Sequence, residues 1–271
     1  MDDNNLESSE FMQRLMEFQV PVCVKNAGTY EQKGTATLLR ILDDYFIVTA
    51  AHVTHLRHQS ADRSIYLYNH HLYEFIQVTE DIFGHDDATD VANEFDISII
   101  KINKENYKEI PDESFLPFHM FLLPNTLLEN HAYIASGYPS SKNRSFPKYK
   151  HRATSCVLIT KEACGDGQPL GELINLHLSY DAADAPDPFG MSGGAIWTIT
   201  TNLEVNPALS GILVSYNEKE NRLTAVKIDY VIALIQAFFP GTLVDHIDLP
   251  FFIVLNEHGG SIHFPTIPVV A

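Results

Sequence analysis

The sequence predicts an all-β protein, either a β-sandwich or a pair of β-barrels, and three observations indicate this class. From residue 20 onward, most apolar and β-branched residues fall in short runs separated by turn residues. A strong helical pattern comes late, over residues 228–239. The predicted strands do not alternate with long helices, which argues against a doubly wound α/β fold.

The first half of the chain begins with a predicted helical leader over residues 1–19. Apolar residues from Leu6 to Phe18 recur at roughly helical spacing, and Ser8 or Ser9 is the expected N-cap. Residues 20–117 form the first predicted β-rich region. Its strands are expected at Val20–Val24, Gly34–Leu42, Tyr45–Thr49, Ser64–Tyr68, Phe75–Val78 and Phe95–Ile102.

The second predicted β-rich region covers residues 118–240. Its strands are expected at His131–Ser136, Thr154–Thr160, Leu173–Leu178, Gly194–Thr200, Leu209–Ser215 and Thr224–Lys227. The apolar spacing predicts a helix over Ile228–Phe239, which Pro240 and Gly241 end. Residues 241–271 form a C-terminal extension with one more apolar run.

Composition limits the possible partners and the compartment. The 271 residues are 45% hydrophobic and carry a net charge of −17, which argues against nucleic acid or an anionic membrane as the main partner. Three cysteines without regular spacing do not suggest a disulfide framework. The acidic N-terminus does not resemble a secretory signal, so we expect a reducing, cytoplasmic location.

Ser192 lies between glycines in the segment Pro188–Trp197, directly before an apolar run. Gly190 and Gly193 allow a tight turn because they lack a Cβ atom, and such a turn would expose the Ser192 hydroxyl. The N–H groups of Gly190 and Ser192 would then point at one spot beside it. Acyl transfer needs this combination of nucleophile and donors. Taken alone, the motif also fits a glycine-rich hairpin turn.

Two further segments carry the residues that such a serine requires. An apolar run leads into a turn of small residues that carries His52. Asp96 lies beside the apolar run that follows it, so its carboxylate is expected to be at least half buried. A buried charge is costly unless it is hydrogen-bonded, and a histidine N–H would provide the partner.

At this point the chain resembles the trypsin/chymotrypsin-type serine proteases, nearest in type to bacterial trypsin-like peptidases without disulfides. The motif residues are Thr49–His52, Asp96–Lys101 and Gly190–Gly194, in the family's order and spacing. Ser136–Tyr138 resembles the start of the family's second barrel, and Gly211–Tyr216 resembles its substrate-binding strand. The resemblance covers about residues 20–240. It implies two six-stranded antiparallel β-barrels.

The resemblance also implies a serine endopeptidase that uses a His52–Asp96–Ser192 triad and no metal or cofactor. Ser192 would attack the scissile carbonyl, and His52 would act as general base and then general acid. Asp96 would hold the tautomer of His52. The N–H groups of Gly190 and Ser192 would form the oxyanion hole.

The substrate-binding residues are predicted from the same resemblance. Ser215 and Tyr216 would line the strand that pairs with the substrate backbone. Asp184 or Asp187 could select a basic side chain, although a solvated acidic loop is the competing interpretation. We expect a protein or peptide substrate. We also expect a regulatory protein partner or a narrow specificity, because a cytoplasmic protease must be restrained.

Met191 departs from the family pattern. Many secreted relatives have an aspartate there, which pairs with a new N-terminus after zymogen cleavage. Methionine implies that this activation is absent, and it leaves open what orders the loop. The cysteines that flank the histidine in secreted relatives are also missing, with Val53 directly after His52, which agrees with a reducing compartment.

Two other functions stay open on the sequence alone. The chain could be a protease-fold scaffold or sensor that is inactive or needs a partner for activation. It could also be an esterase of another fold, which would place a helix after Ser192.

Three charged segments have simple structural interpretations that compete with functional ones. The set His52, His55 and His58 could bind zinc, but it lacks an accompanying carboxylate motif. The segment His85–Asp90 could bind calcium, but it lacks a calcium-loop pattern. A basic island over residues 142–152 could steer an acidic partner. A solvated surface is the favoured interpretation of all three.

Overall fold

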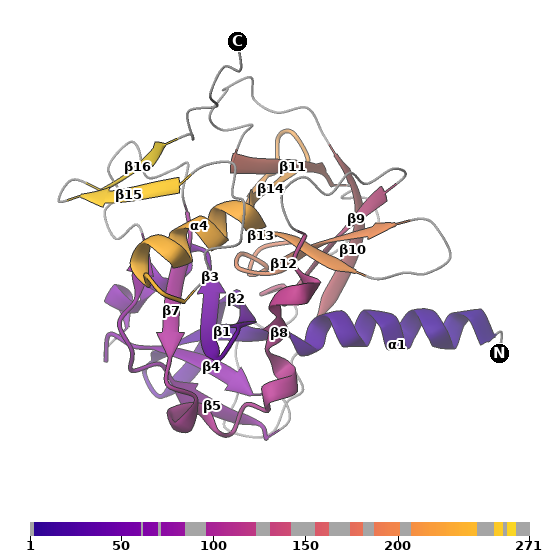
Figure 1. Ribbon diagram of the computed structural model, residues 1–271. Coiled ribbons are helices and arrows are strands. Elements are labelled where there is room, and N and C mark those ends of the chain that lie inside the picture. Colours follow the sequence, from indigo (N-terminus) through magenta and orange to yellow (C-terminus); the bar gives the residue numbers. More distant parts are fainter. Residues whose placement is uncertain are drawn as a thin grey trace, which may run out of the picture.

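Strands dominate both halves of the computed structural model (Figure 1). It describes residues 3–60, 62–69, 72–84, 96–122, 131–141, 155–162, 174–180, 187–200, 207–242, 252–256 and 259–263. The all-β prediction is confirmed. Most strands group into two large sheets that follow one another along the chain, and β15 and β16 near the C-terminus form a separate two-stranded sheet.

The first sheet contains eight strands and lies in the lower part of Figure 1. They are β1 (Gln19–Asn26), β2 (Thr29–Ile41), β3 (Asp44–Thr49), β4 (Ile65–Asn69), β5 (Glu74–Gln77), β6 (Phe83–Gly84), β7 (Ser98–Ile102) and β8 (Leu116–Pro117). Their hydrogen-bonded order is β5-β4-β1-β2-β3-β7-β6, and the neighbours are antiparallel. The short strand β8 pairs with β2 in parallel.

The second sheet closes on itself as a six-stranded antiparallel barrel, in the order β10-β11-β14-β13-β12-β9. Its strands are β9 (His131–Gly137), β10 (Cys156–Glu162), β11 (Asn175–Ser179), β12 (Ala195–Thr200), β13 (Ala208–Asn217) and β14 (Arg222–Lys227). Closure leaves no unpaired sheet edge. This barrel matches the predicted second barrel in strand number and direction.

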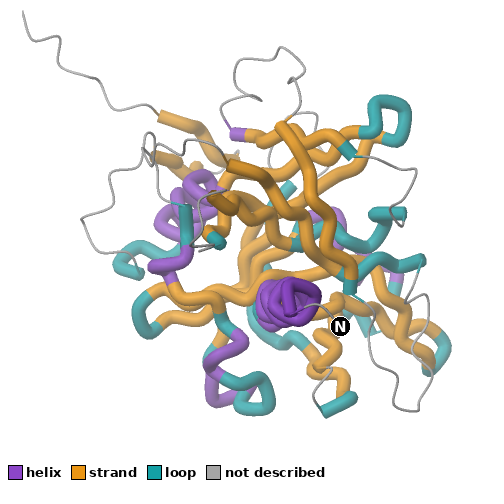
Figure 2. The backbone as a smooth tube through the Cα atoms, turned by 90° about the vertical axis from the view of Figure 1, so that its right-hand side faces the viewer, coloured by secondary structure: helices purple, strands orange, loops and turns teal. Residues whose placement is uncertain are grey.

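The described residues contain few helices, and these lie outside the two large sheets. They are α1 (Asp3–Glu17), α2 (Ala51–His55) and α4 (Ile228–Phe238), with single 3₁₀ turns at Leu56–Gln59, Lys104–Tyr107, Asp112–Ser114 and Phe118–Met120. In Figure 1, α1 projects away from the strands, and Figure 2 shows it end-on. The predicted N-cap at Ser8 or Ser9 is wrong, because both serines lie inside α1. No helix of the described residues is long and apolar enough to cross a membrane.

The C-terminal extension contains a two-stranded antiparallel hairpin. Its strands are β15 (Phe252–Asn256) and β16 (Gly259–His263). The first overlaps the apolar run predicted at Leu249–Leu255. The sequence pattern predicts a turn at Gly259 and Gly260, but this is wrong, because both glycines belong to β16 and pair with β15.

Two apolar clusters make up most of the core. The larger one joins buried side chains of both halves, including Leu38, Phe46, Trp197 and Ile235. A second cluster fills the closed barrel and includes Met191. Each fully buried side chain of this kind contributes about 1.5–3 kcal/mol of transfer free energy. The larger cluster therefore docks one half against the other and brings their loops together.

Candidate active site

His52 lies in α2, three residues after the buried end of strand β3. Ala50 and Ala51 before it are at most 5% exposed, and the Ala51 N–H donates to the backbone carbonyl of Asp96 at 3.1 Å. Small side chains permit this close backbone approach. The His52 side chain itself is half exposed. The buried, hydrogen-bonded backbone of this turn thus holds the imidazole of His52 at the surface.

The Asp96 carboxylate holds His52 in two ways. One oxygen lies 2.5 Å from Nδ1 of the ring, and the other accepts the backbone N–H of His52 at 2.8 Å. An ionised carboxylate only accepts hydrogen bonds, so Nδ1 must carry the proton. In a neutral ring, Nε2 is then free to accept a proton. The pairing that the sequence predicted between these two residues is present.

A hydrogen bond between two buried side chains links the segments that carry His52 and Asp96. The hydroxyls of Thr54 and Ser98 lie 2.8 Å apart, and Thr54 also donates to the carbonyl of Ala51 at 2.9 Å. Ser98 begins β7, opposite the last residue of β3. Both hydroxyl residues are buried. They tie the helical turn that carries the histidine to the strand that follows the aspartate.

The loop that carries Ser192 depends on glycine at two positions. Gly190 and Gly193 have φ values of 91° and 90°, where side chains with a Cβ atom are strained. A Cβ atom at Gly193 would lie 1.9 Å from the carbonyl oxygen of Thr35. Only glycine therefore fits this approach of the loop to strand β2.

Every backbone carbonyl from Phe189 to Gly193 accepts a hydrogen bond. The donors, in chain order of the carbonyls, are Ser140 N at 2.6 Å, Thr35 Oγ1 at 2.9 Å, Gly194 N at 2.8 Å, Thr35 N at 2.8 Å and Thr37 Oγ1 at 2.9 Å. Three of these five bonds come from strand β2. The first half of the protein therefore fixes the orientation of peptides in the second half.

Two backbone N–H groups in this loop have no acceptor among the described residues. Those of Met191, Gly193 and Gly194 donate to backbone carbonyls. Those of Gly190 and Ser192 donate no hydrogen bond to any described residue. In a planar trans peptide, the N–H points opposite to the C=O of the preceding residue. The bonds from Ser140 and Gly194 to the preceding carbonyls therefore direct these two N–H groups to the other side of the loop backbone.

Met191 anchors the loop from inside the second barrel. Its side chain is 0% exposed and belongs to the apolar cluster that includes Leu178, Ile196 and Leu213. Its N–H donates to the carbonyl of Pro188 at 2.9 Å. Apolar burial thus holds this position, at which the resembling secreted proteases have an aspartate.

Gly34 of strand β2 lies against both the helix that carries His52 and the loop that carries Ser192. A Cβ atom at Gly34 would lie 2.6 Å from the side chain of Val53 and 3.0 Å from the carbonyl oxygen of Ser192. The residue after the histidine and the backbone of the serine therefore border one glycine. Among the described residues, the Ser192 hydroxyl makes no hydrogen bond, including to His52. In unliganded active sites this bond is often long.

The predicted substrate-binding residues lie beside the loop but differ in exposure. Ser215 is exposed and Tyr216 is half-buried, both in β13. Asp187 accepts the backbone N–H of Phe189 at 3.0 Å, so its carboxylate turns toward its own loop. Loss of hydration, followed by the carboxylates of Glu218 and Asp187, raises the pKa of Tyr216. Asp184 lies outside the described residues.

Sequence reasoning did not single out Phe189. Its side chain is 58% exposed, and its ring stands edge-on to that of Tyr216, with centroids 6.4 Å apart. An aromatic residue directly before Gly190 was the available signal. It adds an apolar surface next to the candidate nucleophile.

The other candidates that the sequence suggested do not join the site in the described structure, or fall outside it. The segments 85–95 and 142–154 lie outside the described residues. The rings of His55 and His58 are in contact, with centroids 5.0 Å apart, but no group of three metal-binding side chains occurs among the described residues.

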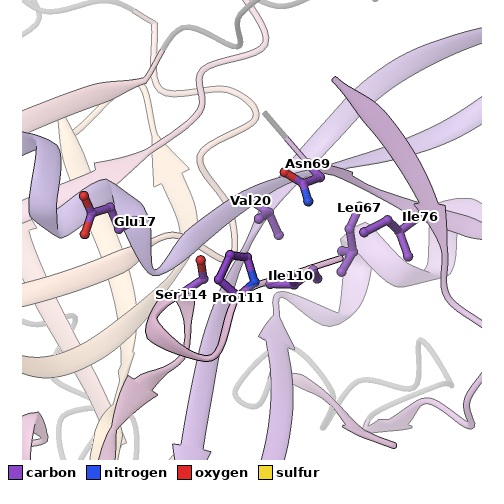
Figure 3. Close-up of a pocket in the computed structure, with 8 residues that line it drawn as sticks. All are labelled: Glu17, Val20, Leu67, Asn69, Ile76, Ile110, Pro111 and Ser114. Atoms are coloured by element: carbon purple, nitrogen blue, oxygen red, sulfur yellow. The ribbon is translucent and has the colours of Figure 1, made fainter. Parts of the chain in front are cut away.

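The pocket in Figure 3 lies between apolar side chains of the first half, such as Val20 and Ile110. Its volume of ≈ 10 Å³ holds about one water molecule, too little for a peptide side chain.

The chain that follows Ser192 decides one of the alternatives. It enters strand β12, not a helix. The nucleophile turn of the esterase alternative requires a helix there. That alternative is therefore wrong.

Comparisons with known proteins give a remote likeness in fold. No protein-family model matches the sequence, and no curated protein sequence matches it. A serine endoprotease from Yersinia pestis is 15% identical over 82% of this chain and 64% of its own, with a TM-score of 0.49. This chain thus spans less than two thirds of that structure. The serine protease domain of the Sesbania mosaic virus polyprotein is 15% identical over 79% of this chain and 90% of its own, with a TM-score of 0.46. A likeness of this size does not establish a reaction.

Proposed function

We propose that this protein is a serine endopeptidase with a His52–Asp96–Ser192 triad. The observation that carries the proposal is the loop in which every carbonyl is bonded while the N–H groups of Gly190 and Ser192 donate to no described residue. Gly190 and Ser192 are both partly exposed, so a bound substrate can reach their backbone donors. Two free donors that flank a serine are suited to bind a negatively charged oxygen.

Acylation would proceed with each residue in a defined role. The Ser192 oxygen forms a bond to the scissile carbonyl carbon while its proton moves to Nε2 of His52. Negative charge develops on the carbonyl oxygen, and the N–H groups of Gly190 and Ser192 stabilise it. The C–N bond then breaks, and His52 returns the proton to the leaving amine. The product is an ester between Ser192 and the acyl half of the substrate.

Deacylation repeats these steps with water as the nucleophile. His52 takes a proton from water as the new C–O bond forms, and Ser192 leaves with that proton when the ester breaks. Asp96 stays ionised throughout and stabilises the imidazolium that forms twice per cycle. Its two hydrogen bonds to His52 are suited to this role.

A scaffold or sensor without constitutive activity is the second candidate. The observation that favours it is the absence of a hydrogen bond between Ser192 and His52 among the described residues. In that case a partner protein would have to bring the two side chains together before the serine reacts.

A fluorophosphonate probe separates the two candidates. In the reaction, the Ser192 oxygen forms a bond to phosphorus as the P–F bond breaks and fluoride leaves. We expect one label per chain for the purified protein and none for Ser192→Ala. Ser155→Ala removes an exposed hydroxyl outside the site and should label like the wild type. A folded wild-type protein that never labels would refute the constitutive protease.

We further propose a cytoplasmic location, a protein or peptide substrate, and restraint by a partner or by narrow specificity. The half-exposed side chain of His52 and the exposed side chain of Phe189 are accessible to a peptide substrate. Purified protein should cleave few bonds in casein. Rapid, unselective digestion of casein would contradict the proposed restraint.

A further inference from the structure

Gln32 in strand β2 is a buried polar residue with an unusual set of neighbours. It is 4% exposed, and its amide nitrogen lies 3.3 Å from the carbonyl oxygens of Gly34 and Gly190 and closer to that of Tyr138. Three acceptors around one end identify it as the NH₂ end of the amide. The amide oxygen is buried and has no hydrogen-bond partner among the described residues.

Packing does not account for glutamine at this position. An unpaired buried polar group costs about 1–3 kcal/mol, which an apolar side chain of similar size would avoid. The two N–H donors of the amide are instead shared among carbonyls of three separate segments. These are its own strand, the residue that follows β9, and the loop that carries Ser192.

Thr35 provides a second donor to the same loop carbonyl. Its buried hydroxyl donates to Gly190 at 2.9 Å and accepts the N–H of Tyr138 at 3.0 Å. Gln32 and Thr35 therefore both hold Gly190 to Tyr138, and we call this pair the carbonyl clamp.

We propose that Gln32 is the positioning residue that keeps the oxyanion-binding loop in its reactive form. The inference rests on the proposed function, since the loop matters only if Ser192 reacts. Gln32 touches no substrate and acts through Gly190. By holding the carbonyl of Gly190, it fixes the peptide that follows this glycine.

Gly190 needs such a restraint because of its own freedom. A glycine near φ 91° can rotate to other conformations without steric cost. The peptide that Gln32 holds lies between the two peptides that carry the free N–H groups of Gly190 and Ser192, so rotation at Gly190 would change the angle between these two donors. Position 191 carries no charge that could hold the loop by an ion pair. Side-chain donors from β2 supply the restraint instead.

The variant Gln32→Met tests the proposal because it keeps the volume of the side chain and removes its donors. Loss of one whole oxyanion donor costs about 10²–10³ in rate. Thr35 still holds Gly190 in this variant, so we expect the fluorophosphonate labelling rate constant to fall by about 10-fold. The final stoichiometry should stay at one label per chain.

The final stoichiometry of labelling distinguishes a positioning role of Gln32 from damage to the fold by the substitution. A partly unfolded population lowers the final amount of label, whereas a misplaced loop slows the labelling of every molecule. The pH midpoint of labelling should not move, because the bonds between His52 and Asp96 are untouched. Gln77→Met, at an exposed position of β5, is the matched control and should label at the wild-type rate.

Each outcome decides a different claim. If wild-type protein labels and Gln32→Met labels at the same rate, the positioning role is wrong and the endopeptidase proposal stands. If wild-type protein never labels, both are wrong. If Gln32→Met does not fold, Gln32→Asn replaces it, since this variant keeps an amide and shortens its reach. Slow but complete labelling of Gln32→Asn supports the role, and a wild-type rate overturns it.

Discussion

Replacing Met191 by aspartate tests what orders the loop around the candidate nucleophile. Met191 is 0% exposed inside the second barrel, among side chains such as Leu178, Ile196 and Leu213. An aspartate there would suit a protein that offers it a cationic partner. Here the residues of its cluster are apolar, so we expect the substitution to destabilise the fold.

The magnitude follows from two contributions. Loss of the buried methionine side chain removes about 1.5–3 kcal/mol of transfer free energy. Burial of an unpaired carboxylate adds several kcal/mol even after the surroundings relax. The sum, about 5 kcal/mol or more, is comparable to the whole stability of many domains, about 5–15 kcal/mol. We therefore expect a strongly lowered urea midpoint and little fluorophosphonate labelling.

The pH dependence of this variant gives an independent check. Burial would raise the pKa of the introduced carboxyl above its unfolded value. A raised folded-state pKa means that the destabilisation is present at neutral pH and decreases as the pH falls toward the unfolded value. The stability gap between Met191→Asp and wild type should therefore narrow from pH 7 to pH 5.

Met191→Leu is the matched control, because it nearly conserves volume and should cost less than about 1.5 kcal/mol. Urea unfolding followed by tryptophan fluorescence measures all three proteins. Trp197 belongs to strand β12 of the same barrel, and its buried indole packs in the cluster that joins the two halves, so its fluorescence reports global unfolding. If Met191→Asp were as stable as Met191→Leu at pH 7 and labelled at the wild-type rate, the apolar anchor would be refuted.

Two further predictions concern the other parts of the site. Asp96→Asn should slow labelling by about 10⁴-fold, the size expected when a triad histidine loses its tautomer, with the thermal midpoint nearly unchanged; a rate within tenfold of wild type would exclude the role of this carboxylate. Backbone strain alone at a glycine such as Gly193 costs about 1–2 kcal/mol. Gly193→Ala should lower the free energy of unfolding in urea by more than this, because its Cβ atom would also lie 1.9 Å from the carbonyl oxygen of Thr35. Gly28→Ala has a similar φ of 84° with nothing within 4 Å, so it isolates the strain, and equal costs in both variants would contradict the clash.

The sequence predicted the parts of the site that have local patterns. His52, Asp96 and Ser192 each adjoin a strand with a recognisable apolar run, so their positions at strand ends could be anticipated. Most strands of the closed barrel and the helix after it could be predicted for the same reason, whereas the barrel form itself was implied by the family resemblance. The short strands β6 and β8 could not, because a two-residue strand has no periodicity. The predicted start of α1 is too late, since serine also occurs inside helices.

The residues that hold the site together lie outside what local patterns can reveal. Gln32 and Thr35 act on Gly190, which is 158 and 155 residues away along the chain. Nothing near Gln32 in the sequence distinguishes it from a surface residue of a β-strand. Its role follows only from the docking of the two halves, which places three carbonyls around its amide.

The candidate site is divided between the two halves of the protein. His52 and Asp96 belong to the first half, whereas Ser192 and its loop belong to the second. The loop carbonyls are bound by side chains and backbone of β2, so the bonds that direct its N–H groups form when the halves pack together. A loop held by such contacts becomes ordered as part of folding, because Gln32, Thr35 and the apolar anchor Met191 are all buried in the folded protein. Its order therefore depends on the packing between the halves, and a change in that packing would alter the free N–H groups of Gly190 and Ser192 and the placement of His52 relative to Ser192 together.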